Sequence, residues 1–283
     1  MKKSILFGFT VVLLTLIPTA TNTVSQEQKE KTKSILVGGS DHRHEHALGS
    51  WHFIKYDNVS KNIVQIHSQQ LDKRTGRVGR SAGTGVIVKC ARTELHPENP
   101  NFYRGFIVTC DHVVPKSGMI DGTLEVKFQN ETIISEDSVV VMNHEGHDIA
   151  LIRCWIPLEY EGLVISKSPL GFGETVRMIG YGGLPDVTKP RYFEAEVYRW
   201  SPYLITVLED AARGDSGGAI VNEKGQLIGL ISRGVSSFEQ REGLILTSPL
   251  HGPAANGLIM VITAYLQTQE MKKKYNVPSI LNK

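Results

Sequence analysis

One serine in this chain has neighbours that suit a nucleophile. Ser216 is the centre of the run Gly214-Asp215-Ser216-Gly217-Gly218, which is followed by an apolar run (AIV), a turn (NEKG) and a second apolar run (QLIGLIS). Glycines on both sides permit a tight turn that presents the hydroxyl outward. We expect the N–H groups of Gly214 and Ser216 to converge on one point, where they would form an oxyanion hole for an attacked carbonyl group.

A serine hydroxyl is a weak nucleophile without a base, so this interpretation requires a histidine that is held by a carboxylate. His112 lies just after an apolar run in GFIVTCDHVV, and Asp148 begins another in HDIALIR. In this hypothesis His112 takes the proton of Ser216 and later returns it to the leaving group, while Asp148 fixes the histidine tautomer. Taken singly, His112 would be a structural histidine at a strand end and Asp148 a turn residue.

The elements that must position these residues are short and apolar. From about Trp51 the chain has brief Val- and Ile-rich runs separated by Gly, Asn, Asp and Pro, a pattern typical of an all-β sandwich or a pair of barrels. After Pro253 the spacing changes to i, i+3, i+4, i+7 and i+8, which predicts a helix docked on the barrel. The apolar residues at these positions are Leu258, Val261, Ile262, Tyr265 and Leu266.

The start of the chain predicts export. Lys2 and Lys3 precede an apolar stretch over residues 5–17, which is typical of a signal peptide and too short for a comfortable membrane span. We expect residues 1–22 to be a signal peptide or an N-terminal anchor and residues 23–50 to be a polar linker. The protein would then be periplasmic or secreted, and bound to a membrane only if the first segment is retained.

Composition restricts the classes of partner. The 31 Lys and Arg residues nearly balance the 29 Asp and Glu residues, so no nucleic-acid partner is expected. Three cysteines, Cys90, Cys110 and Cys154, cannot all pair within one chain, and we expect them to act as small buried apolar residues.

Four ordered motifs resemble those of a known family. SAGTGVIV, IVTCDHVV around His112, DIAL at Asp148 and GDSGG around Ser216 are similar to the trypsin-like serine proteases, and several are similar to the bacterial HtrA-type branch. The chain order His, Asp, Ser is also that of the chymotrypsin class. The resemblance covers about residues 63–249. HtrA-type enzymes usually add a PDZ domain, for which we expect no room after the helix.

The resemblance implies a fold and an activity. The fold would be all-β, with two six-stranded antiparallel Greek-key barrels at about 51–160 and 161–250, a C-terminal helix and tail at 251–283, and the triad in the cleft between the barrels. The activity would be that of a serine endopeptidase that acts on protein or peptide substrates through an acyl-enzyme, with no cofactor and no metal. The alternative is a non-catalytic module that keeps the fold for binding or chaperoning.

The resemblance leaves the substrate pocket open. An ungapped match to trypsin places Asp210 at the floor of the pocket for the P1 residue, the residue before the cleaved bond, with Ser232, Gly234 and Gly243 along its wall. Such a pocket would favour cleavage after Arg or Lys. LEDAARGDSGG also resembles the HtrA-type segment, in which the preferred P1 residue is apolar.

Two further features have alternative interpretations. Residues 33–39 resemble the activation site of trypsin-like zymogens, which implies that Asp215 could pair with an amine freed by cleavage before Leu36, but we expect an internal donor and a preformed site. His42, His44 and His46 alternate and could bind a transition metal, although a polar loop is the commoner explanation for such a stretch.

Overall fold

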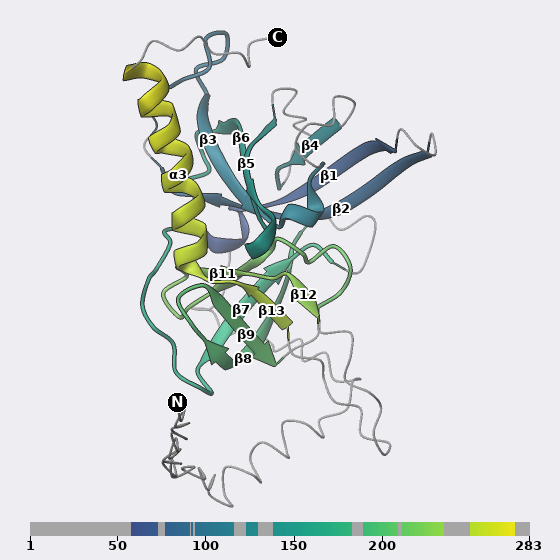
Figure 1. The fold of residues 1–283 in the computed structure, drawn as a ribbon, viewed down its shortest axis with the longest axis vertical. Helices are drawn as coiled ribbons and strands as arrows, with labels where there is room; N and C mark the ends of the chain where they lie inside the picture. Colours follow the sequence, from purple (N-terminus) through teal and green to yellow (C-terminus); the bar gives the residue numbers. More distant parts are fainter. Residues whose placement is uncertain are drawn as a thin grey trace, which may run out of the picture.

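Two antiparallel sheets and one helix make up the computed structural model of the chain (Figure 1). The structure describes residues 58–72, 77–90, 92, 94–115, 123–129, 138–182, 189–208, 211–234 and 250–274. The sheets lie one above the other, and the helix starts near their junction and runs beside the first sheet. The expected all-β fold, with two barrel-like antiparallel sheets and a C-terminal helix, is confirmed.

The first sheet has six strands in the order β4-β1-β2-β3-β6-β5. Strand β6, which lies between β3 and β5, is buried at nearly every position because its two faces pack against different cores. Ile149 and Leu151 face the cluster between the sheets, whereas Ala150 and Ile152 face the core of the first barrel. The strands are β1 (Ile63–Asp72), β2 (Arg77–Val88), β3 (Phe102–Thr109), β4 (Thr123–Lys127), β5 (Val139–His144) and β6 (Ile149–Pro157).

The second sheet has seven strands in the order β11-β10-β7-β8-β9-β13-β12, one more than expected because the two-residue β12 pairs with β13. An isolated bridge between Gly229 and Ala254 brings β11 beside the end of β13, so the sheet closes on itself. The strands are β7 (Thr175–Gly180), β8 (Arg191–Trp200), β9 (Leu204–Leu208), β10 (Ala219–Val221), β11 (Leu227–Leu230), β12 (Arg233–Gly234) and β13 (Leu250–Pro253).

Helix α3 (Ala255–Lys274) covers the junction of the two sheets (Figure 1). Leu258, Val261 and Tyr265 are buried in a cluster that also contains residues of both sheets. Leu266 is 45% exposed, contrary to the expected buried face. The reason is geometric, because Leu266 lies about 80° around the helix from Leu258 at 3.6 residues per turn.

None of the described helices is long and apolar enough to cross a membrane. The expected signal segment at 1–22 and the linker at 23–50 lie outside the described residues, as does the histidine stretch at 42–46.

The contrast between two leucines of α3 gives a stability prediction. Leu258→Ala removes a fully buried side chain from the cluster between the sheets, so we expect it to lower the free energy of unfolding by about 2–5 kcal/mol. Leu266→Ala, in the same helix, should change it by only about 0.5 kcal/mol. Urea unfolding of both variants measures the difference, and equal losses would contradict the described packing of α3.

Candidate active site

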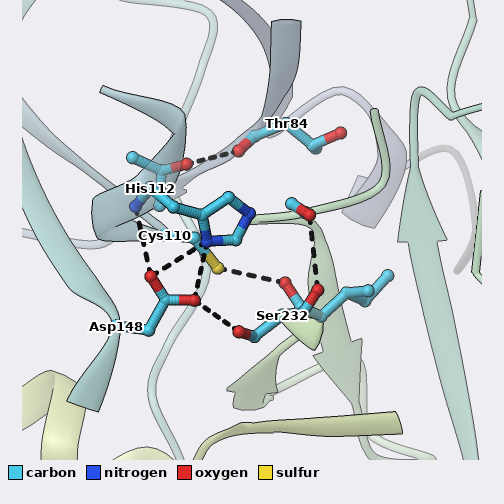
Figure 2. Close-up of polar contacts among 8 residues, drawn as sticks. Thr84, Cys110, His112, Asp148 and Ser232 are labelled. Carbon is cyan, nitrogen blue, oxygen red and sulfur yellow. Dashed lines mark hydrogen bonds and ion pairs between the residues drawn. The ribbon is translucent and has the colours of Figure 1, made fainter. Parts of the chain in front are cut away.

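The structure brings His112 and Asp148 into direct contact (Figure 2). His112 lies in the short 3-10 helix η1 (Asp111–Val113), and its Nδ1 is 2.9 Å from Oδ1 and 2.8 Å from Oδ2 of Asp148. An ionised carboxylate can only accept hydrogen bonds, so Nδ1 must carry the proton. In a neutral imidazole this leaves Nε2 as an acceptor, which is the form that a general base requires.

The backbone of Asp148 has an uncommon conformation that helps to position its carboxylate. With φ 52° and ψ 49° it is in the left-handed region, and it is the only non-glycine residue with positive φ among those described. It caps the 3-10 helix η2 (Glu145–His147), where its N–H donates to the carbonyl of Glu145 at 3.1 Å. Aspartate tolerates this conformation better than most residues, which suits this turn to the start of β6.

Donors from His112 and Ser232 bond to the Asp148 carboxylate. They are the backbone N–H of His112 at 3.1 Å, the His112 ring, and the hydroxyl of Ser232. Burial by itself would raise the pKa of Asp148, but the hydrogen bonds from His112 and Ser232 outweigh it and hold the pKa well below its usual range. The carboxylate is therefore ionised at neutral pH.

The turn around Ser216 has the backbone that its glycines predict. Gly214 has φ 100° and Gly217 φ 85°, both in the region that favours glycine. A Cβ on Gly217 would lie 2.0 Å from the carbonyl oxygen of Thr84, so no larger residue fits there. Within the described parts of the chain, no acceptor takes the N–H of Gly214 or of Ser216. These are the two donors expected for an oxyanion hole.

Thr84 on β2 holds this turn from the other sheet. Its N–H donates to the carbonyl of Ser216 at 2.8 Å, and its hydroxyl donates to the carbonyl of Gly214 at 2.7 Å. The same hydroxyl accepts from the N–H of Tyr181 at 2.9 Å, and the Thr84 carbonyl accepts from the hydroxyl of Thr109 at 2.6 Å. Thr84 thus engages the carbonyl groups of both residues whose N–H groups are expected to form the oxyanion hole.

Ser232 connects the nucleophile to the carboxylate. The Oγ of Ser216 donates to the Ser232 carbonyl at 3.3 Å, and the Ser232 hydroxyl donates to Asp148. In the described regions no hydrogen bond joins Ser216 directly to His112. Catalytic hydrogen bonds are often loose before substrate binds, and a rotation about the Cα–Cβ bond of Ser216 redirects its hydroxyl.

The predicted pocket residues are only partly described. Asp210 and Gly243 lie outside the described residues, and Gly234 is the second residue of β12. Ser232, which the sequence assigns to the pocket wall, turns its hydroxyl to Asp148 (Figure 2). Sequence reasoning missed this contact and the role of Thr84. The motif SAGTGVIV marked the segment of Thr84 but not which residue of it would act.

The thiol of Cys110 also lies close to His112 and Asp148. Ligand atoms of Cys110, His112 and Asp148 lie within 4.8 Å of one another, close enough to hold a metal ion. However, burial, followed by the nearby charge of Asp148, raises the pKa of the Cys110 thiol, which donates to the carbonyl of Ile231 at 3.2 Å. Metals bind the thiolate, so this arrangement favours the role of a buried apolar residue. Cys90, Cys110 and Cys154 are all free, and the last two are buried.

The chain is similar to several known proteins. The profile of the family described as "Trypsin-like peptidase domain" matches residues 83–230. The periplasmic serine endoprotease DegP of Salmonella typhimurium is 30% identical over 169 residues, a match that covers 52% of this chain and 29% of DegP. The match thus spans less than a third of the length of DegP.

Two solved structures share the fold. The Rv3671c protease from M. tuberculosis, in its active form, has a TM-score of 0.54 at 19% identity, over 74% of this chain and 82% of that one. The serine endoprotease from Yersinia pestis has a TM-score of 0.56 at 19% identity, over 78% of this chain and 68% of that one. At this level of identity the likeness concerns the fold alone.

The bond from Ser232 to Asp148 gives a pH-dependent prediction. In Ser232→Ala the carboxylate loses one donor, so the pKa of Asp148 should rise towards its usual range. When folding lowers the pKa of a carboxyl group, the charged group stabilises the fold at pH values above its unfolded pKa, which is about 3.9 for aspartate. This stabilisation is lost as the pH falls through the folded-state pKa. The variant should therefore be less stable than wild type at neutral pH, and the difference should narrow in acid as its Asp148 binds a proton.

Urea unfolding across the acid range measures this difference, and NMR titration of the carboxyl follows the pKa directly. Ser216→Ala is the matched control, because it removes a hydroxyl of the same site that bonds to Ser232 and not to Asp148. An unchanged pKa of Asp148 in Ser232→Ala would refute the assigned contact.

Proposed function

Because this chain belongs to the family of trypsin-like peptidase domains, we propose that it is an exported serine endopeptidase that cleaves peptide bonds through Ser216, His112 and Asp148. Membership of the family confirms the resemblance read from the four motifs, and the similarity to DegP agrees with the HtrA-type features. The periplasmic location of DegP and the signal-like segment at 1–22 support the proposed export.

One observation carries the proposal. Nδ1 of His112 lies 2.8 Å from the carboxylate of Asp148, and hydrogen bonds through Ser232 connect that carboxylate to Ser216 in its glycine turn. At that turn two amides meet no acceptor within the described parts of the chain. A base, a nucleophile and an anion site are the three parts that acyl transfer requires.

The proposed mechanism follows from these parts. Nε2 of His112 accepts the proton of Ser216 as its Oγ attacks the carbonyl carbon, and the N–H groups of Gly214 and Ser216 stabilise the oxyanion. The imidazolium then gives the proton to the leaving amine, and an acyl-enzyme remains on Ser216. Water, deprotonated by His112, releases the acid. Asp148 stays ionised throughout and stabilises the imidazolium, in accordance with its lowered pKa.

Covalent labelling tests the catalytic proposal. A fluorophosphonate should label wild-type protein on Ser216, because the probe needs both an activated serine and an oxyanion hole. Ser216→Ala should not be labelled and should hydrolyse a protein substrate roughly 10⁶-fold more slowly. His112→Ala should also lose labelling, although it keeps the serine. A folded wild-type protein that the probe never labels would favour the alternative of a non-catalytic binding module.

The substrate preference forms a separate part of the proposal. We take Asp210 as the residue that selects a basic P1 side chain, since a buried carboxylate binds a guanidinium in two parallel hydrogen bonds. A peptide library should therefore show cleavage after Arg and Lys, and Asp210→Ser should reduce kcat/KM for these peptides far more than for others. A preference for Ala or Val would reject the basic pocket and favour the HtrA-type alignment, and the triad would be unaffected.

A further inference from the structure

Helix α3 runs beside the first sheet (Figure 1), and an open cavity is lined by residues of both. Its volume is about 760 Å³, which is in the range of pockets that hold small organic ligands. The lining comes from the end of β2, from β3 and β6, from residues 164–165 and from α3. None of the residues proposed for catalysis lines it. A ligand bound in this cavity would therefore leave the triad free.

Most of the cavity lining is apolar. Val88 and Tyr265 line it and also belong to the cluster between the sheets. Phe106 packs edge-on against Tyr265, with ring centres 5.5 Å apart. Val164 and Leu266 come from distant segments, line the same cavity and remain 47% and 45% exposed. Exposed apolar residues that gather at one hollow are typical of a surface that binds a ligand.

Positive charge is in excess around the cavity. Lys89, Arg104 and Arg153 line it, and Glu94 is the only acidic residue that does so within the described parts of the chain. Nη2 of Arg104 lies 3.4 Å from Oε1 of Glu94, so these two charges offset each other. No carboxylate of the described residues forms an ion pair with Arg153. The cavity therefore favours a ligand that carries negative charge.

The guanidinium of Arg153 has hydrogen-bonding capacity that the fold does not use. Arg153 lies on β6, and its Nη1 donates to the hydroxyl of Tyr265 at 3.3 Å. Its Nε is buried and meets no acceptor among the described residues. A buried donor without a partner is unfavourable, so an acceptor supplied by a ligand would be bound favourably. A carboxylate matches a guanidinium in charge and in the spacing of its two oxygens.

We propose that this cavity binds an apolar carboxylic acid, whose carboxylate pairs with Arg153 and whose hydrocarbon part packs between Phe106 and α3. The site is separate from the proposed peptidase function and does not depend on it. Val88 and Tyr265 belong both to the cavity and to the cluster between the sheets. A bound acid therefore stabilises the junction that fixes one sheet relative to the other.

Calorimetry at neutral pH with octanoate and 1-octanol tests the class of ligand, because these probes share an apolar chain and differ in the charge of the head group. Wild-type protein should bind octanoate at least about tenfold more tightly than 1-octanol, since a hydrogen bond to a charged group adds to the apolar contact. Octanoate should also raise the melting temperature as its concentration increases. Equal affinities for the two probes, or no binding of octanoate, would overturn the proposal.

Arg153→Met tests the role of the guanidinium, because methionine keeps much of the side-chain volume and removes the charge. The variant should bind octanoate only as tightly as 1-octanol, and its affinity for 1-octanol should equal that of wild type. Arg177→Met is the matched control, since Arg177 lies on β7 of the second sheet, outside the cavity, and pairs with Glu194. The control should bind octanoate as wild type does. Unchanged affinity for octanoate in Arg153→Met would refute the proposed contact.

A second pair of measurements locates the bound probe. Leu266→Trp should narrow the cavity and weaken the binding of both probes, and the fold should tolerate it because Leu266 is 45% exposed. Cys90 lines the cavity and is half-buried, whereas Cys110 and Cys154 are buried. Bound octanoate should therefore slow the alkylation of Cys90. Binding that survives Leu266→Trp, or that leaves the alkylation of Cys90 unchanged, would place octanoate elsewhere and contradict the proposal.

Discussion

The active site depends on one threonine through which the two sheets meet. Thr84 belongs to the first sheet, yet its N–H and its hydroxyl engage the carbonyls on both sides of Asp215 in the second. His112 and Asp148 lie next to strands of the first sheet, and Ser216 lies just before a strand of the second. Their alignment therefore requires that one sheet keep a fixed position relative to the other. Side chains that do chemistry must be held within fractions of an ångström, and Thr84, which is fully buried, makes its hydrogen bonds out of contact with water.

Two carboxylates lie near Ser216, and only that of Asp215 is fully buried. Asp148 faces a histidine whose charge changes during the reaction, and it accepts bonds from His112 and Ser232 that keep it ionised. Asp215 faces Arg191, whose charge does not change, and its cradle of Gly180 and Gly182 leaves no space for rearrangement. The first carboxylate can thus respond to proton transfer, whereas the second supplies a fixed geometry.

The parts of this fold that sequence reasoning predicts are those with a local cause. Short Val- and Ile-rich runs predict strands, and the spacing of Leu258, Val261 and Tyr265 predicts α3, because one buried face repeats at a regular interval. Leu266 was assigned to the same face, since the pattern does not show how wide the contact is. Contacts such as Ser232 with Asp148 or Arg191 with Asp215 join residues 84 and 24 positions apart, and no local pattern encodes them. The pocket residues Asp210 and Gly243 remain predictions.

The cluster under α3 has a consequence for how the protein loses its structure. Val86 and Leu151 of the first sheet, Ile179 and Leu230 of the second, and Leu258 of the helix share a single apolar core. Neither barrel can melt while the other stays intact without exposing this surface to water. Heat or denaturant should therefore unfold both barrels in a single cooperative transition. An intermediate in which one barrel is folded and the other is unfolded should not accumulate.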